Sequence, residues 1–328
     1  MSKFTALLVE KDDKGEFTRN LVERDTSALP EGDVLIDVKF SSLNFKDALS
    51  ATGNPGVSRN FPHTPGIDAA GTVLESSDSR VQPGTEVLVT GYDLGMNTSG
   101  GFGQRIRVPG SWVVCLDALS MRDSMIIGTA GLTAALCIEK LLHMGLEQNS
   151  GKVLVTGASG GVGSFAVALL SQLGFEVSAV SGKPEQTSFL EKLGASEVIS
   201  RKQFMEGAGR PMLKEQWAGV VDSVGGEMLF AAIKSLRYGG SAAACGLVAS
   251  MDIPATVLPF ILRSVNLLGI DSVELPLDKK QAVWKKLGNE WRLKCLEDLV
   301  KEIRLSEVSS AIDTILAGKM VGRGLVIL

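Results

Sequence analysis

The chain has 328 residues, 45% of them hydrophobic, and its 33 Lys and Arg against 37 Asp and Glu give a formal net charge of −4 at pH 7. This length is sufficient for two domains with a large buried core, and the acidic balance provides no basic field that would hold a nucleic acid. The four cysteines are widely spaced and there are two histidines, so we expect neither a disulfide framework nor a structural zinc site.

The first residues lead directly into an amphipathic strand at residues 6–9, without the long apolar core of a signal peptide. The most apolar stretches further along are interrupted by glycine or by charged residues before they reach the length of a membrane span. We therefore expect a cytoplasmic protein that has no membrane partner.

Residues 1–122 are predicted to form a β-rich domain. Its short strands are separated by turns that contain Pro-Gly. They are expected at residues 34–38, 71–74, 86–89 and 104–108. The tail, residues 296–328, again shows the pattern of short strands and turns. It ends in an apolar strand at residues 324–328, which we expect to rejoin the β-rich domain.

Residues 123–295 show a different periodicity, in which apolar strands alternate with helical segments. This alternation is typical of a parallel sheet covered by helices on both faces. Six strands are expected, at residues 153–156, 177–180, 198–199, 219–222, 241–245 and 267–271. We therefore predict an α/β fold in which a doubly wound, Rossmann-type domain is inserted into the β-rich domain.

A glycine-rich turn joins the first of these strands to a helix, in the sequence Val-Leu-Val-Thr-Gly-Ala-Ser-Gly-Gly-Val-Gly at residues 153–163. Gly157, Gly160 and Gly163 allow the backbone to turn tightly and to approach a pyrophosphate, and the N-terminus of the next helix attracts its charge. The alternative is a glycine-rich loop that only packs the helix on the strand. The complete strand, turn, helix and strand unit favours dinucleotide binding.

The second strand ends in Ser181-Gly182-Lys183, about 20 residues beyond the glycines, where an acidic residue would bind the adenosine ribose of NAD. No carboxylate repels a 2′-phosphate here, and a hydroxyl, backbone N–H groups and an ammonium are available to bind one. We therefore expect NADPH as the cofactor. Arg201 follows the next strand and could lie over the adenine or the phosphate. Taken singly, Lys183 and Arg201 could equally be solvated surface residues.

Several separate motifs resemble the zinc-free quinone oxidoreductase branch of the medium-chain dehydrogenase/reductase superfamily. They are the glycine turn, Leu-Asn-Phe-Lys-Asp at residues 43–47, Pro-Gly-Ile-Asp-Ala-Ala-Gly at 65–71, Gly-Thr-Ala-Gly-Leu-Thr-Ala at 128–134, and Asp-Ser-Val-Gly-Gly at 222–226. Within that branch, Ala-Cys-Gly-Leu at 244–247, Pro-Phe-Ile-Leu-Arg at 259–263 and Gly-Ile-Asp-Ser-Val at 269–273 resemble the YhdH/YhfP group, which contains the acryloyl-CoA reductases.

The resemblance implies a GroES-like β-rich catalytic domain and a Rossmann coenzyme domain. The positions that hold catalytic zinc in zinc-dependent relatives are occupied by Asn44, Ile67 and Thr129. An amide, an alkyl group and a hydroxyl do not form the thiolate and imidazole set that zinc requires, so no metal is expected. Reduction of an activated C=C bond is then implied, with acryloyl-CoA reduced to propanoyl-CoA as the first hypothesis. An NADPH:quinone or small-enone oxidoreductase is the alternative, and NADPH binding without turnover is a third hypothesis.

The resemblance also implies a set of cofactor-binding residues. Those expected at the pyrophosphate are Ser159, Gly160, Gly161, Val162 and Gly163. Those expected at the 2′-phosphate are Ser181, Gly182, Lys183 and Arg201. Those expected at the nicotinamide half are Phe45, Leu247, Ile261 and Ser272. Leu247 and Ile261 are otherwise ordinary core residues.

Phe45 stands where relatives of the group often carry tyrosine, so an apolar surface is kept but an ionisable proton is absent. Asn44 and Asp47 are the remaining candidates for a catalytic role, although Asp47 could instead satisfy its own turn. Water, or a group such as Tyr92, would then have to protonate the product.

Two further interpretations concern partners. Arg323 and Lys319 could attract the phosphates of coenzyme A, or they could be solvated residues at the chain end. A homodimer is implied by the resemblance, because the strand at residues 267–271 is an apolar edge that could pair with its twin.

Overall fold

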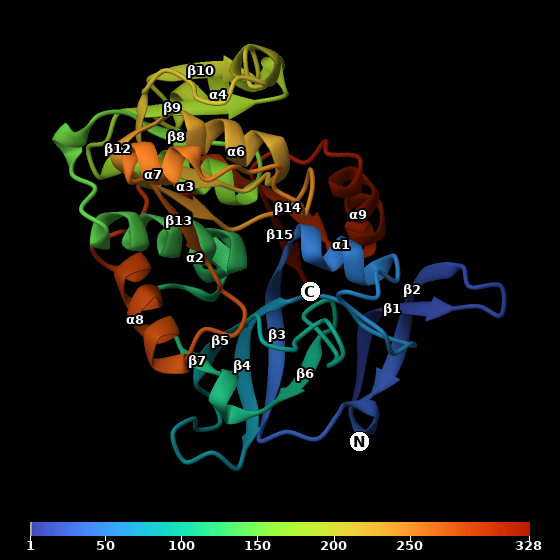
Figure 1. The fold of residues 1–328 in the computed structure, drawn as a ribbon. Helices are drawn as coiled ribbons and strands as arrows, with labels where there is room; N and C mark the ends of the chain where they lie inside the picture. The colour runs from blue at the N-terminus through green and yellow to red at the C-terminus, as the bar shows by residue number, and fades with distance from the viewer. Residues whose placement is uncertain (1) are drawn as a thin grey trace. The chain divides into compact units, whose positions relative to one another are not determined.

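The computed structural model of the chain describes residues 2–328, and these divide into two compact units. The β unit comprises the chain up to Thr129, together with Ser272–Arg292 and Leu299–Leu328. The α/β unit comprises Ala130–Asp271 and Leu293–Asp298. Figure 1 shows the elements of both units along the chain.

In the β unit, the described residues form a seven-stranded sheet in the order β14-β15-β3-β4-β5-β7, with β6 paired to β3. Its strands are β3 (Val34–Leu43), β4 (Asp68–Ser76), β5 (Glu86–Thr90), β6 (Arg105–Val108), β7 (Val114–Cys115), β14 (Val300–Arg304) and β15 (Arg323–Ile327). The last strand, β15, pairs antiparallel with β3. The tail therefore rejoins the β-rich sheet, as its sequence predicted.

The β unit also contains a hairpin and further helices. They are β1 (Lys3–Lys11) with β2 (Phe17–Asp25), α1 (Phe45–Ala51), α8 (Leu277–Gly288) and α9 (Val308–Leu316). Ala48 of α1, Ile312 of α9 and Val326 of β15 share one buried apolar cluster. This packing fixes the start of α1, which carries several of the predicted site residues.

In the α/β unit, six parallel strands among the described residues follow the order β10-β9-β8-β11-β12-β13. They are β8 (Val153–Val155), β9 (Val177–Ser181), β10 (Glu197–Ser200), β11 (Trp217–Asp222), β12 (Leu236–Ala244) and β13 (Asn266–Gly269). Numbered from β8, this order is 3-2-1-4-5-6, which is that of the doubly wound dinucleotide-binding fold. The predicted fold class is thus confirmed.

The helices of this unit are α3 (Gly161–Gln172), α4 (Thr187–Lys192), α5 (Arg201–Phe204), α6 (Gly226–Lys234) and α7 (Leu258–Arg263). Apolar side chains of the strands and of α6 form a buried cluster that includes Leu154, Val220 and Leu229. The carboxyl end of β8 is in this way held rigidly next to the glycine turn.

The long helix α2 (Met121–His143) begins in the β unit and ends in the α/β unit. It is kinked at Gly128, where φ is 51° and ψ is −164°. Contrary to the expectation from sequence, this helix is long and apolar enough to cross a membrane, but most of its apolar stretch is buried inside the protein. It has the character of a core helix.

The unit boundaries differ from those expected at residues 122 and 295. Residues up to Thr129 belong to the β unit, because Thr129 is bound to Asp68 of β4. Ser272–Arg292 also belongs to the β unit. The Lys280 side chain of this segment donates to Thr90 O at the end of β5, and the Tyr92 hydroxyl donates to Leu275 O of the segment. The sequence pattern shows where helical periodicity begins, but it does not show which sheet a helix contacts.

Candidate functional site

The glycine turn lies between β8 and α3, at the carboxyl edge of the parallel sheet. Gly157 has a φ of +59°, which favours glycine, and a side chain on Gly163 would overlap the backbone of Gly157 and Ala158. Gly160 precedes α3 and has no side chain with which to cap it. The first N–H groups of α3 can therefore bind a phosphate, as its twelve-residue dipole favours.

The residues predicted to bind the 2′-phosphate lie together at the end of β9. The hydroxyl oxygens of Ser181 and Ser159 are 3.3 Å apart, and the Lys183 N–H donates to Ser181 Oγ at 3.1 Å. A Cβ on Gly182 would lie 3.0 Å from Nη2 of Arg201, so the guanidinium rests on this glycine. Partial burial lowers the pKa of Lys183, and a bound phosphate would favour its charged form.

A second glycine motif supports this turn from β11. Asp222 accepts from Thr156 Oγ1 at 2.5 Å and from the Gly225 N–H at 2.8 Å. Burial raises the pKa of Asp222. The segment that follows β12 is bound to the glycine motif at residues 222–226, since the Ala249 N–H donates to Val224 O at 2.9 Å. Asp222 thereby connects the glycine turn to the segment that carries Leu247.

Leu247 and Ile261, predicted at the nicotinamide half, are 54% and 69% exposed. They are not core residues of this chain. Large apolar side chains at such exposure, close to one another in sequence, are available for a ligand or a partner to cover.

In the β unit, Phe45 is the half-buried first residue of α1, and Asn44 and Asp47 form a capping box at its start. The carboxylate of Asp47 is completely buried and accepts from the N–H groups of Asn44 and Ile67, at 2.7 and 2.8 Å. Both candidates for a catalytic role therefore hold the backbone beside Phe45 in this structure.

Asp68 is the centre of a buried polar network, hereafter the Asp68 network. It accepts from Asn44 Nδ2 at 2.8 Å, from the Thr129 N–H at 2.8 Å, from Thr129 Oγ1 at 2.5 Å and from the hydroxyl of Ser42. Four donors, from β3, from the residue before α1 and from α2, thus converge on one carboxylate of β4. Sequence analysis did not identify Asp68, although it lies within one of the motifs that carried the resemblance.

Arg323 contributes the positive charge beside this network. It is 2% exposed, and its Nε donates to Ile126 O at 2.9 Å while Nη1 donates to Asn44 Oδ1 at 3.3 Å. The expectation that Arg323 attracts coenzyme A phosphates is therefore wrong, because β15 places it in the interior. Burial lowers its pKa, while burial and the charge of Asp68 raise the pKa of Asp47 to about 7.

The hydroxyl of Tyr92 donates its proton in a hydrogen bond inside the protein. Tyr92 is 8% exposed and donates to Leu275 O at 3.0 Å. Burial raises its pKa. In this structure the Tyr92 hydroxyl is therefore not available to protonate a ligand.

The residues at the zinc-ligand positions of the fold do not fit a zinc ion. Asn44 Nδ2 and Thr129 Oγ1 donate to Asp68, and Asn44 Oδ1 accepts from Arg323. Ile67 has no ligand atom in its side chain. Residues 2–328 contain no group of three or more His, Cys, Asp or Glu side chains that could hold a metal. The Asp68 carboxylate joins these segments through four hydrogen bonds.

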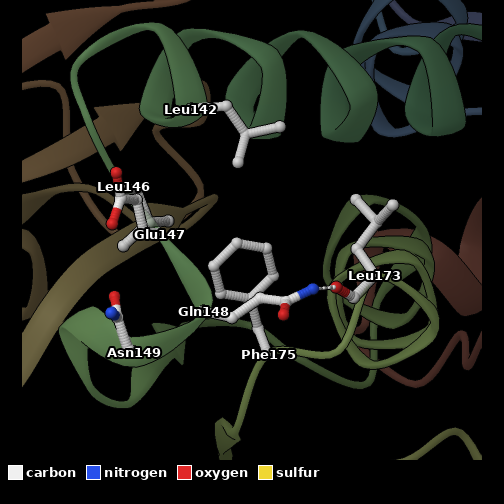
Figure 2. Close-up of a pocket in the computed structure, with 7 residues that line it drawn as sticks. All are labelled: Leu142, Leu146, Glu147, Gln148, Asn149, Leu173 and Phe175. Atoms are coloured by element: carbon white, nitrogen blue, oxygen red, sulfur yellow. Dashed lines mark hydrogen bonds between the residues drawn. The ribbon is translucent and has the colours of Figure 1, made fainter.

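The α/β unit has a hollow of about 540 Å³. Figure 2 shows its apolar lining of Leu142, Leu146, Leu173 and Phe175, with Gln148 Nε2 donating to Leu173 O at 2.6 Å. These residues precede β8 and β9, so the hollow is at the amino edge of the sheet. The glycine turn is at the opposite edge, where ligands bind in doubly wound folds.

Known proteins match this arrangement. The family model of the alcohol dehydrogenase GroES-like domain matches residues 30–118, and that of the zinc-binding dehydrogenase matches residues 161–315. The "probable acrylyl-CoA reductase AcuI" of Escherichia coli is 46% identical over 98% of both chains. The "putative quinone oxidoreductase YhfP" of Bacillus subtilis is 43% identical, also over 98% of both chains.

Two solved structures are closely similar. Escherichia coli YhdH with bound NADPH is 46% identical and has a TM-score of 0.95 over 98% of this chain and 99% of that one. Bacillus subtilis YhfP with bound NAD is 42% identical and has a TM-score of 0.96 over the whole of both chains. The fold and the dinucleotide class of the ligand therefore agree with the geometry of the glycine turn.

Proposed function

The chain belongs to the zinc-free quinone oxidoreductase branch of the medium-chain dehydrogenase/reductase superfamily, in the YhdH/YhfP group, and we propose that it is an NADPH-dependent acryloyl-CoA reductase. The observation that carries the proposal is the 46% identity to the protein named "probable acrylyl-CoA reductase AcuI" over 98% of both chains. The product would be propanoyl-CoA.

The residues around the glycine turn support NADPH as the cofactor. The N-terminus of α3 would bind the pyrophosphate, and Ser181, Lys183 and Arg201 would bind the 2′-phosphate. Ser159, Gly160, Gly161, Val162 and Gly163 would line the pyrophosphate, as expected from the sequence. The position of the glycine turn at the carboxyl edge of the sheet favours this assignment. The three residues at the end of β9, Ser181-Gly182-Lys183, contain no acid, which also favours it.

The nicotinamide half would contact Phe45, Leu247, Ile261 and Ser272. The reduced coenzyme would supply a hydride for the β carbon of the enoyl thioester. The π electrons of the C=C bond would move to the thioester oxygen, and water would give a proton to the α carbon. Phe45 provides an apolar surface but has no ionisable proton, and the Tyr92 hydroxyl donates its proton in a hydrogen bond to Leu275 O. Asn44 and Asp47 act as positioning residues, because they hold the first turn of α1 beside Phe45.

The alternative is an NADPH:quinone or small-enone oxidoreductase, and it is favoured by the 43% identity to the protein named YhfP. Purified protein should be assayed for NADPH oxidation with acryloyl-CoA and with 1,4-benzoquinone in parallel. We expect a higher kcat/KM with acryloyl-CoA, and a much higher value with the quinone would reject our proposal. If no substrate of a panel of enones, thioesters and quinones consumes NADPH, the protein binds the coenzyme without turnover.

We also propose that the protein is a homodimer. The strand β13 is at the end of its sheet and pairs only with β12 among the described strands. Leu267 on this edge is 39% exposed, and Val257 and Leu262 nearby in sequence are 66% and 60% exposed. An unpaired apolar edge of this kind is suited to pairing with a second copy about a twofold axis.

A cytoplasmic location, with a small-molecule substrate and with neither membrane nor nucleic-acid partners, is part of the same proposal. NADPH and acyl-CoA thioesters are the co-substrates that this activity requires. The formal charge of −4 also argues against a nucleic-acid partner.

A further inference from the structure

Lys280 of α8 is a lysine in the interior of the β unit, with an exposed fraction of 0%. Its Nζ donates to Thr90 O at 2.7 Å and to Val273 O at 3.3 Å, and it lies 3.5 Å from the centroid of the Tyr92 ring. Burial of an ammonium is unfavourable unless such groups replace its water. A leucine or methionine would fill the same space without the desolvation cost of an ammonium. Packing alone therefore does not explain a lysine at this position.

The contacts of Lys280 join the end of β5 to the irregular segment Ser272–Leu275. Tyr92 adds two bonds to the same segment, from its N–H to Val273 O at 3.1 Å and from its hydroxyl to Leu275 O at 3.0 Å. Val273 O therefore accepts from two donors. The ring of Tyr92 is itself stacked on Trp112, with centroids 5.5 Å apart.

The backbone around Tyr92 is shaped for this contact. Gly91 has a φ of +72°, and a Cβ on it would lie 3.0 Å from Val273 Cα and 3.2 Å from Ser272 O. Tyr92 has a φ of 53°, which is unusual for a residue other than glycine. The segment therefore lies directly against Gly91, and Ser272 at its start is 6% exposed.

We propose that Lys280 is a positioning residue for the coenzyme, because it holds the segment that places Ser272 at the nicotinamide carboxamide. The ammonium has three donors, so it can bind two carbonyl groups that belong to different segments, and its charge strengthens both bonds. This inference rests on the role proposed above for Ser272.

A double-mutant cycle on coenzyme binding tests the proposal. NADPH affinity is measured by fluorescence titration of the wild type, Ser272→Ala, Lys280→Met and the double variant. We expect Ser272→Ala to weaken NADPH binding about tenfold, as for the loss of one buried hydrogen bond. In the Lys280→Met background the same substitution should have an effect below about twofold. An equal effect in both backgrounds would overturn the proposal.

Binding of 2′,5′-ADP, which lacks the nicotinamide half, separates positioning from general damage. Its affinity should be unchanged in Lys280→Met, whereas a parallel loss of 2′,5′-ADP and NADPH affinity would contradict a role at the nicotinamide. If the wild type binds neither NADPH nor 2′,5′-ADP, the proposed function itself is rejected. The role of Ser272 fails, and the inference with it, if Ser272→Ala leaves NADPH affinity unchanged while the wild type binds both.

Two further variants complete the experiment. Lys234→Met is the matched control, because Lys234 is also buried and donates to Arg210 O at 3.0 Å, but in the α/β unit. In the Lys234→Met background, Ser272→Ala should weaken NADPH binding as much as it does in the wild type. If Lys280→Met does not fold, Tyr92→Phe removes only the bond to Leu275 O. In the Tyr92→Phe background, the loss of NADPH affinity caused by Ser272→Ala should be smaller by at least about twofold. An unchanged loss counts against the proposal.

Discussion

The hydroxyl of Thr129 donates to Asp68 Oδ1 at 2.5 Å, so a residue at a zinc-ligand position of the fold is bound to a carboxylate. The same carboxylate accepts from Asn44, at a second of these positions. Stability and the geometry around Phe45 therefore depend on one buried charge and its partners, and several predictions concern this network.

Replacing Asp68 by Asn should destabilise the β unit strongly. An amide cannot accept from all four donors, and the nearby charge of Arg323 loses a compensating anion. Breaking a buried charge pair from one side costs about 3–5 kcal/mol. Urea unfolding of Asp68→Asn should show a loss of this order. Asp78→Asn, at a half-buried carboxylate paired with the exposed Arg80, is the control. An unchanged midpoint in Asp68→Asn would show that the network contributes little.

Gly128→Ala should destabilise the kink of α2. The residue has a φ of +51°, and a Cβ there would lie 2.6 Å from Arg323 Nη2 and 2.7 Å from Asp68 Oδ2. Left-handed backbone at a residue other than glycine costs about 1–3 kcal/mol, and the overlap adds to this. Gly145→Ala has a similar φ of +89° with no atom within 4 Å of the added Cβ. Gly128→Ala should lose more unfolding free energy than Gly145→Ala, and equal losses would contradict a cost of overlap at the kink.

Lys183→Ala should weaken NADPH binding much more than NADH binding. A charge-assisted bond to the 2′-phosphate contributes about 1.5–3 kcal/mol, or roughly 10- to 150-fold in affinity. Titration of both coenzymes gives the ratio directly. Lys192→Ala, at a surface lysine paired with Asp298, should change neither affinity. Equal losses for the two coenzymes in Lys183→Ala would remove this lysine from the 2′-phosphate site.

The stability of the protein should carry a pH dependence from Asp47. Its pKa is raised from 3.8 to about 7 in the folded protein. The folded state therefore binds more protons than the unfolded state in this range, so the contribution of Asp47 is complete below about pH 4 and is lost as the pH rises through about 7. Asp47→Asn should flatten the slope of the unfolding free energy over this window, whatever its effect on absolute stability.

Asp78→Asn is the control of opposite sign, because hydrogen bonds with Arg80 lower the pKa of Asp78 to about 2. Its contribution is present above about pH 4 and is lost as the pH falls through about 2. The Asp78 variant should therefore leave the slope between pH 4 and 7 unchanged. A slope that is the same in Asp47→Asn and the wild type would refute the assignment to Asp47.

Leu267→Asp should convert the proposed dimer into a monomer. A carboxylate at the edge of β13 would be repelled by its twin and would lose water on pairing. Gel filtration with light scattering gives the mass directly. Leu74→Asp, at a similarly exposed leucine of β4, should leave the mass unchanged. A wild-type protein that is monomeric at micromolar concentration would contradict the dimer itself.

The predicted parallel sheet and the glycine turn are confirmed because they depend on contiguous residues. Residues 153–163 specify strand, turn and helix by themselves, since glycine conformations and apolar alternation are local properties. The strand ends were less well predicted: β13 ends at Gly269 rather than at residue 271, and β12 begins at Leu236 rather than at residue 241. Pairing with neighbouring strands decides these limits.

The sequence by itself thus determined the fold class, the strands of the parallel sheet and the kind of coenzyme, because each is encoded in short motifs. Only the tertiary structure decided that Arg323 is buried beside Asn44, 279 residues away, and that Lys280 joins β5 to the segment of Ser272. A lysine or arginine has the same appearance in a sequence whether it is solvated or buried. The packing of distant segments supplies the partners that make burial of its charge possible.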